Sequence, residues 1–196
     1  MRLISLLLII LFFSSCKEEI IVLPKPRMYP KIDFPEKSYR SFTTPDCPFS
    51  MDVPEYFKVI ADTDTLHQDK NQCWFDLHSS ELNTYLHLSY LPVDDRKHFD
   101  KLMVDAFEMA DEHNIKANYR DEIKISDSDR NMHGIIFEID GPVATPIQFF
   151  VTDSTSHFLR GSLYFKSQVN RDSIAPIYDF VKTDINKLLE TFQWGE

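Results

Sequence analysis

The densest set of reactive side chains lies in one short stretch, from Asp153 to His157, with the sequence Asp-Ser-Thr-Ser-His. A carboxylate, a hydroxyl and an imidazole are the groups of an acyl-transfer triad. Such a triad is assembled in space and needs an oxyanion hole, usually with its serine on a Gly-x-Ser-x-Gly elbow, and that motif is absent from the sequence. The same polar residues favour tight turns, so we interpret the stretch as a hairpin turn and expect no enzyme.

A second stretch, from Asp127 to Asn131, has the spacing of the first three ligands of a calcium loop, and Glu138 falls where a bidentate carboxylate would follow. Met132 occupies the position where such a loop requires glycine, and both flanks have the pattern of strands rather than helices. We therefore favour a solvated turn over a calcium site. The histidines form no His-x-x-x-His pair and no Cys-x-x-Cys occurs, so zinc spacing is missing too, and we expect no metal or other cofactor.

Cys16 has the surroundings of a lipidated cysteine. Arg2 precedes an apolar run from Leu3 to Phe13, which is shorter than the roughly 20 residues of a transmembrane helix and resembles a signal peptide. Phe13-Ser14-Ser15-Cys16 matches a bacterial lipobox, in which a peptidase cuts before a cysteine whose thiol carries diacylglycerol. We predict that residues 1–15 are removed and that Cys16 carries two or three acyl chains, such as palmitate, because stable anchoring takes more than one. The alternative is an ordinary secretory peptide that happens to contain a cysteine.

The other two cysteines are Cys47 and Cys73. An exported protein lives in an oxidising compartment, where such a pair tends to close, so we predict a Cys47–Cys73 disulfide. Two separate buried thiols are the alternative, since sequence spacing does not show whether the two Cα atoms lie within roughly 7 Å.

The composition suits one acidic globular domain. With 196 residues and 43% hydrophobic content the chain can bury a core of its own. Its formal net charge of −10 makes nucleic acid and anionic lipid headgroups poor partners. Only four glycines are present, so the chain has almost none of the residues that a phosphate-binding glycine loop needs.

The elements that would position these residues divide the chain into a signal peptide (1–15), a lipidated proline-rich tether or arm (16–46) and one globular domain (47–196). Four aromatic residues in the arm indicate that its later part lies on the domain or on a partner, and we favour the domain. Alternating apolar residues predict strands, and helical spacing predicts an amphipathic helix capped by Asp94 or Asp95 and a second one from Ser173 to Thr191. The predicted strands are 49–53, 56–60, 73–77, 84–91, 122–126, 133–139, 147–152 and 157–165.

This order of elements predicts an α+β sandwich, in which an antiparallel β-sheet packs against two amphipathic helices that cover one of its faces. It resembles PsbP/Mog1-like domains, whose opening stretch is similar to Phe49-Ser50-Met51-Asp52-Val53-Pro54.

From the lipobox to the C-terminus, the sequence resembles the gliding motility lipoprotein GldD family of gliding bacteria with type IX secretion. The stretches that carry the resemblance are Pro24-Lys25-Pro26-Arg27 with Tyr29, Ile32-Asp33-Phe34-Pro35, Cys47-Pro48-Phe49, Cys73-Trp74-Phe75, His87-Leu88-Ser89-Tyr90, Ile147-Gln148-Phe149, Thr152-Asp153-Ser154, His157-Phe158-Leu159-Arg160-Gly161 and Glu190-Thr191-Phe192-Gln193-Trp194.

The resemblance implies an envelope-anchored accessory lipoprotein, required for gliding motility and the associated secretion machinery, that acts through protein–protein contacts. It would be held in the inner or outer membrane with its domain in the periplasm. Lys25, Arg27, His157 and Arg160 are then candidate partner contacts, although each could equally be ordinary surface. The alternative function is a periplasmic ligand-binding or hydrolytic domain, which a pocket gathering His87, His133 or His157 with a carboxylate would favour.

Overall fold

The computed structural model describes residues 31–45, 47–61, 73–112, 116–166 and 171–195, so the signal peptide, Cys16, Lys25 and Arg27 lie outside the described residues. The strands are β1 (Tyr39–Thr44), β2 (Cys47–Pro54), β3 (Lys58–Ala61), β4 (Cys73–Ser79), β5 (Thr84–Pro92), β6 (Tyr119–Asp127), β7 (Met132–Asp140), β8 (Ile147–Thr152), β9 (His157–Phe165) and β10 (Gln193–Trp194). The helices are α2 (Arg96–Asp111) and α3 (Arg171–Thr191).

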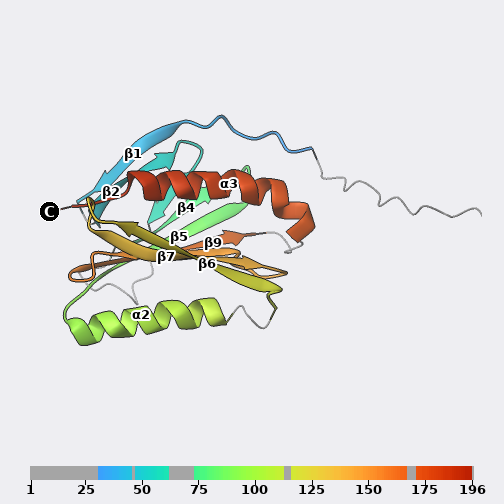
Figure 1. The fold of residues 1–196 in the computed structure, drawn as a ribbon. Helices are drawn as coiled ribbons and strands as arrows, with labels where there is room; N and C mark the ends of the chain where they lie inside the picture. Colours follow the sequence, from blue (N-terminus) through green and yellow to red (C-terminus); the bar gives the residue numbers. More distant parts are fainter. Residues whose placement is uncertain (1–30, 46, 62–72, 113–115, 167–170, 196) are drawn as a thin grey trace, which may run out of the picture.

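A seven-stranded antiparallel sheet forms the middle layer, with the strand order β3-β4-β5-β9-β8-β7-β6. Helix α3 lies on one of its faces, together with a small sheet ordered β1-β2-β10, and helix α2 lies on the other (Figure 1). The predicted α+β sandwich is therefore confirmed. No helix in the described part of the chain is both long and apolar enough to cross a membrane.

The expectation that both helices cover the same sheet face was wrong, and strand β8 gives the physical reason. All six of its residues are buried. Phe149 and Val151 belong to the core under α3, whereas Phe150 belongs to a separate core formed with α2. A strand that is apolar on both faces needs cover on both, so one helix packs against each side of the sheet.

The small sheet holds the later part of the proline-rich arm on the domain. Strand β1 pairs antiparallel with β2, so that Phe42 lies opposite Met51, and the ring of Phe42 packs on Phe75 of the large sheet with 4.9 Å between centroids. Ahead of β1, Phe34 stacks on Phe180 of α3 at 4.6 Å. These contacts place the described part of the arm against its own domain.

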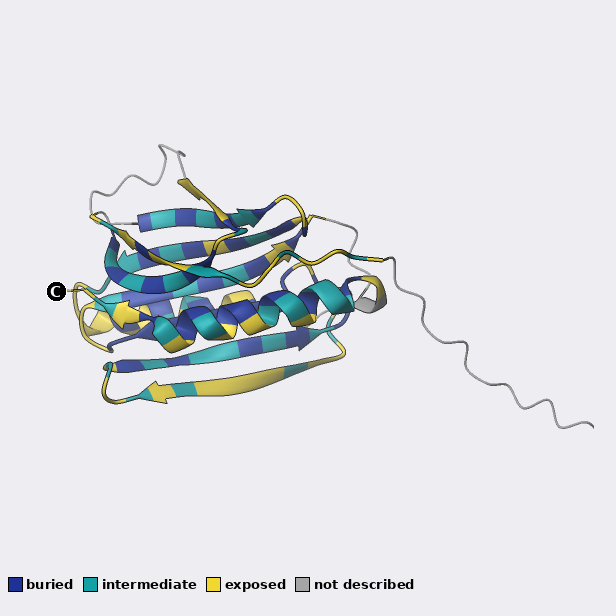
Figure 2. Ribbon diagram, turned by 90° about the horizontal axis from the view of Figure 1, so that it is seen from above, coloured by how far each residue is buried: buried dark blue, intermediate teal, exposed yellow. Residues whose placement is uncertain are grey.

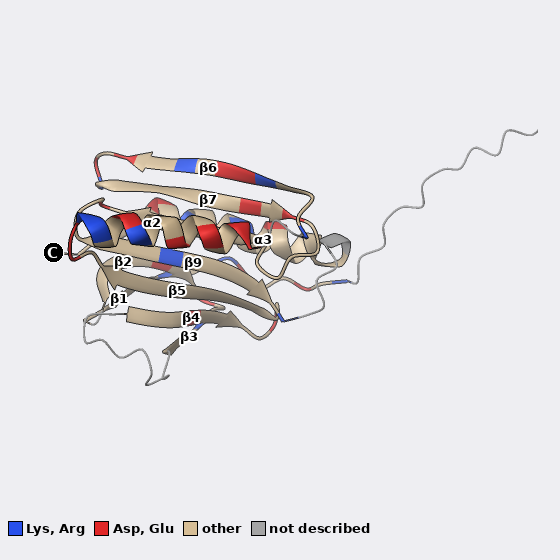
Figure 3. Ribbon diagram, turned by 90° about the horizontal axis from the view of Figure 1, so that it is seen from below, with Lys and Arg blue, Asp and Glu red and all other residues tan. Residues whose placement is uncertain are grey.

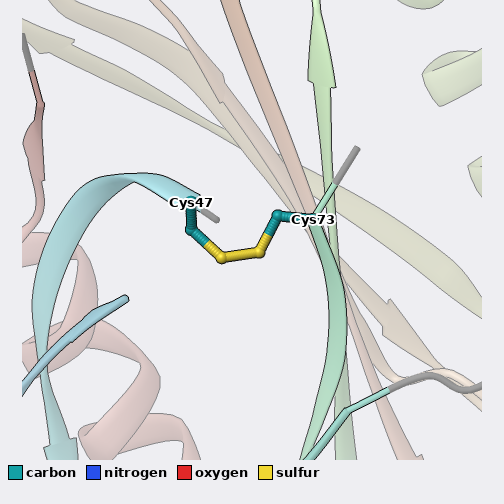
Figure 4. The surroundings of a disulfide bond; sticks show 2 residues. All are labelled: Cys47 and Cys73. Carbon is teal, nitrogen blue, oxygen red and sulfur yellow. A yellow bond between two sulfur atoms is a disulfide. The ribbon is translucent and has the colours of Figure 1, made fainter. Parts of the chain in front are cut away.

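Cys47 and Cys73, the predicted pair, are joined in the structure (Figure 4). Their Cα atoms lie 5.4 Å apart, within the range that a disulfide requires. Cys47 begins β2 of the small sheet and Cys73 begins β4 of the large sheet, so the bond fastens the two sheets to each other.

Candidate functional site

Three segments that are distant in sequence meet at one end of the sandwich, and we call this place the end surface. They are the turn between β6 and β7, the turn between β8 and β9, and β10 with the residue after it. Together they line a hollow of about 540 Å³. The lining residues are Asp129, Arg130, Asn131, Asp153, His157, Gln193, Trp194 and Gly195. The two stretches singled out for their chemistry are therefore neighbours in space.

Asp153 organises the turn between β8 and β9. Its carboxylate accepts hydrogen bonds from the backbone N–H groups of Thr155, Ser156 and His157 at 2.8–2.9 Å, and from the Thr155 hydroxyl at 2.7 Å. Burial opposes ionisation of this carboxyl, but these hydrogen bonds outweigh burial and hold the pKa of Asp153 below its ordinary value. The carboxylate is thus engaged by the turn backbone, as the turn interpretation predicted, and does not contact the imidazole of His157 as a triad acid would.

His157 is held by aromatic neighbours. Its Nδ1 lies 2.8 Å from the Tyr90 hydroxyl, and its ring stacks on Trp194 with 5.1 Å between centroids. Burial, reinforced by the negative charge of Asp153, raises the pKa of Tyr90. Trp194 in turn meets Phe192 edge to face at 4.6 Å. His157 therefore links the large sheet to the C-terminal segment.

Arg130 closes the end of α3. Its guanidinium donates to the carbonyl oxygens of Leu189, Glu190 and Phe192 at 2.9, 2.7 and 3.0 Å. Carbonyls at a helix C-terminus have no partner within the helix, and a cation there also interacts favourably with the helix dipole. Asp127 orients the arginine through a bond of 2.8 Å from Nε.

Two carboxylates of the calcium-like pattern, those of Asp127 and Glu138, are also engaged by cationic side chains. The backbone and side-chain hydrogen bonds from Arg130 hold the pKa of Asp127 below its ordinary value. Glu138 binds the Lys182 ammonium at 2.6 Å instead of facing the turn. Among the described residues, no three histidine, cysteine or acidic side chains are grouped so that they could hold a metal ion. What the geometry builds here is a braced turn.

The predicted contacts His157 and Arg160 do not form one surface. They lie three residues apart on β9, so their side chains point to opposite faces of the sheet. Arg160 contacts the Met109 sulfur of α2, and burial lowers the pKa of its guanidinium. A Cβ added at Gly161 would lie 2.2 Å from the Phe149 ring, so this glycine serves core packing.

The histidines named for a hydrolytic site are equally dispersed. His87 pairs with Asp76 on the sheet surface, His133 borders a groove beside α2, and His157 lies at the end surface. Neither the groove nor the end surface gathers two of them.

A buried polar cluster on α3 escaped the sequence reasoning. Asp184 is 1% exposed and accepts hydrogen bonds from the hydroxyls of Tyr39 at 2.6 Å and Tyr56 at 2.5 Å, and from the Lys37 ammonium at 3.0 Å. Burial is the largest cause that raises the pKa of each tyrosine, and the hydrogen bond to Asp184 adds to it. The only signal in the sequence is an acid beside Ile185 in an apolar stripe.

Comparisons with known proteins give one family. The family model described as gliding motility lipoprotein GldD matches residues 19–194. Among solved structures, the solution structure of cyanobacterial PsbP (CyanoP) from Synechocystis sp. PCC 6803 has a TM-score of 0.48 and 7% identity, and the match covers 82% of this chain and 94% of that one. No curated protein matches the sequence.

Proposed function

Because the chain belongs to the gliding motility lipoprotein GldD family, we propose that it is an accessory lipoprotein of the gliding apparatus and its type IX secretion machinery, acting by protein–protein contact. Cys16 would carry the lipid anchor, in the inner or outer membrane, and the domain would work in the periplasm. The protein would contribute binding rather than catalysis.

The observation that carries this proposal is the convergence at the end surface. Three of the stretches that resemble the family, Thr152–Ser154, His157–Gly161 and Glu190–Trp194, contribute residues to the same hollow. The first two flank the turn between β8 and β9, whereas the third lies in a distant part of the sequence. Asp153 is committed to its turn and Arg130 to the end of α3. These two side chains are therefore held in fixed positions, which suits recognition.

The chemistry of the rim indicates the kind of partner. Asp129, Asn131 and Gln193 are exposed there, and Trp194 is half-buried with its ring against His157. A half-buried tryptophan among polar side chains is typical of the residues that dominate protein interfaces. Since the rim carries the Asp129 carboxylate while Arg130 is turned inward, a polar or basic protein segment fits it best.

The test is recovery of partners from native envelopes. The full lipidated chain, chemically crosslinked in cells, is purified and the co-purifying proteins are identified by mass spectrometry. Asp129→Lys combined with Gln193→Lys reverses the charge of the rim without touching the bracing contacts, and Lys101→Glu on the exposed side of α2 is the matched control.

We expect motility or secretion components with the wild type and the control, and a clear loss with the rim variant. A Cys16→Ala form separates the contribution of the anchor. Recovery of the same components with the rim variant would refute the end surface as the contact, and a clean monomer in every case would refute the accessory role itself.

A further inference from the structure

A second hollow lies on the face of the large sheet that α2 covers, between α2 and the edge strand β6. Its volume is about 340 Å³, and we call it the α2 groove. It is bordered by Phe99 and Met103 of α2 and by Glu122 and Lys124 of β6. The floor is formed by β7 and β8, with Ile135, Phe150, His133 and Thr152.

The groove exists because the sheet is wider than the helix. Helix α2 packs on β7, β8 and β9 through Phe137, Phe150 and Phe158, whereas β6 continues beyond it as an edge strand that is exposed along most of its length (Figure 2). On β6, Glu122 lies opposite Phe137 and Lys124 lies opposite Ile135, so both charged side chains rise on the α2 side. An apolar floor is thereby left beside a polar wall.

The two charged side chains of β6 that border the groove differ in their ion pairs. Glu122 is bound by Arg120 at 2.7 Å, and the same arginine also pairs with Asp111 of α2. Lys124 has no ion pair with any described residue and is exposed. Charged residues are concentrated on α2 and β6 (Figure 3), yet at the mouth of the groove the one charge without a described counter-charge is positive.

We propose that the α2 groove binds a small amphiphilic monoanion, with its apolar body against Phe99, Met103 and Phe150 and its carboxylate beside Lys124. A volume of about 340 Å³ is at the low end of pockets that take small molecules. At roughly 30 Å³ for each water-sized group, it accepts a body of on the order of ten such groups. This site shares no lining residue with the end surface, although its Ser154 lies next to Asp153 in the turn between β8 and β9, and it does not depend on the proposed function.

The test uses three probes with the same apolar body and different heads: 4-phenylbutyrate, 4-phenylbutanol and 4-phenylbutylamine. The full lipidated chain is placed in nanodiscs, and binding is measured by calorimetry against empty nanodiscs, which accounts for partition into lipid. We expect saturable binding of the carboxylate, at least tenfold tighter than binding of the amine.

Two variants assign the two halves of the site. Lys124→Glu should reverse the preference, so that the amine binds better than the carboxylate, while Lys101→Glu on the exposed side of α2 should leave it unchanged. Met103→Trp should fill the groove and weaken all three probes at least tenfold. Circular dichroism and a melting curve check that each variant is folded.

Equal binding of the three probes, absence of saturable binding, or insensitivity to both Lys124→Glu and Met103→Trp would overturn the proposal. Loss of a protein partner in Met103→Trp, with no probe bound by the wild type, would assign the groove to a protein side chain and would overturn it as well.

Discussion

Replacing Asp184 by alanine should destabilise the protein strongly and release the arm. The carboxylate is 1% exposed and accepts three hydrogen bonds, so its removal leaves the part-buried Tyr56 hydroxyl without this acceptor. Hydrogen bonds to a charged group contribute about 1.5–3 kcal/mol each. Because Tyr39 and Lys37 are partly exposed and can turn to water, we expect a total loss of about 3–5 kcal/mol rather than the full sum.

For a protein of this size that loss corresponds to a fall in melting temperature of about 10 °C. The assay is urea unfolding followed by circular dichroism, with hydrogen exchange of residues 31–44 as a second measurement. Asp179→Ala is the matched control, since Asp179 is an exposed acid on the same helix, and it should cost less than about 0.5 kcal/mol. If Asp184→Ala costs no more than the control, or if exchange in the arm does not increase, the reasoning is refuted.

Three further predictions concern stability. Arg130→Met should cost about 2–3 kcal/mol in urea unfolding, because three carbonyls at the end of α3 lose their donor. Replacing Cys47 and Cys73 by serine should cost about 3.5 kcal/mol, the loop-closure value for a separation of 26 residues, and added reductant should then have no further effect. Folding raises the pKa values of Tyr39 and Tyr56, so tyrosines in the unfolded chain ionise at a lower pH than those in the folded protein. The resulting contribution to the free energy of unfolding is present below about pH 10 and is lost as the pH rises further. Replacing both tyrosines by phenylalanine should therefore flatten the fall in stability at alkaline pH.

Each of these has a contrary outcome. An Arg130→Met protein as stable as the wild type would mean that water caps α3 equally well. A cysteine-free variant that matches the oxidised protein would show that the disulfide does not restrict the unfolded chain. An unchanged alkaline slope in the double phenylalanine variant would place the titrating groups elsewhere.

Local sequence patterns were sufficient to predict both helices and most strands, because each pattern has the period of its element. Asp95, one of the two predicted caps, accepts the His98 backbone N–H at 2.7 Å. Strand β1 was included in the arm because its residues, Tyr39–Thr44, alternate weakly, and their pairing is decided by β2. Helix α2 packs on the face of β8 that α3 does not cover, and the periodicity of a strand does not show which helix will cover which face.

The candidate site was predictable in its pieces but not in its assembly. The stretches 127–131 and 153–157 were identified as turns from their composition. That they share a hollow with Trp194 follows from tertiary packing, because β6 and β8 belong to the large sheet and β10 to the small sheet that packs on it. The capping role of Arg130 could not be foreseen for the same reason, since its acceptors lie about 60 residues further along.

The attachment of the arm also has a mechanical consequence. A pull from an anchor at Cys16 would reach the arm contacts in series: first Phe34 on Phe180, then the bonds to Asp184, then the pairing of β1 with β2. If these contacts broke one after another, the backbone between Phe34 and Cys47 would extend to at most about 45 Å. At Cys47 the load would reach the covalent bond to β4 of the large sheet, so the disulfide would prevent the pull from detaching β2 from the folded domain.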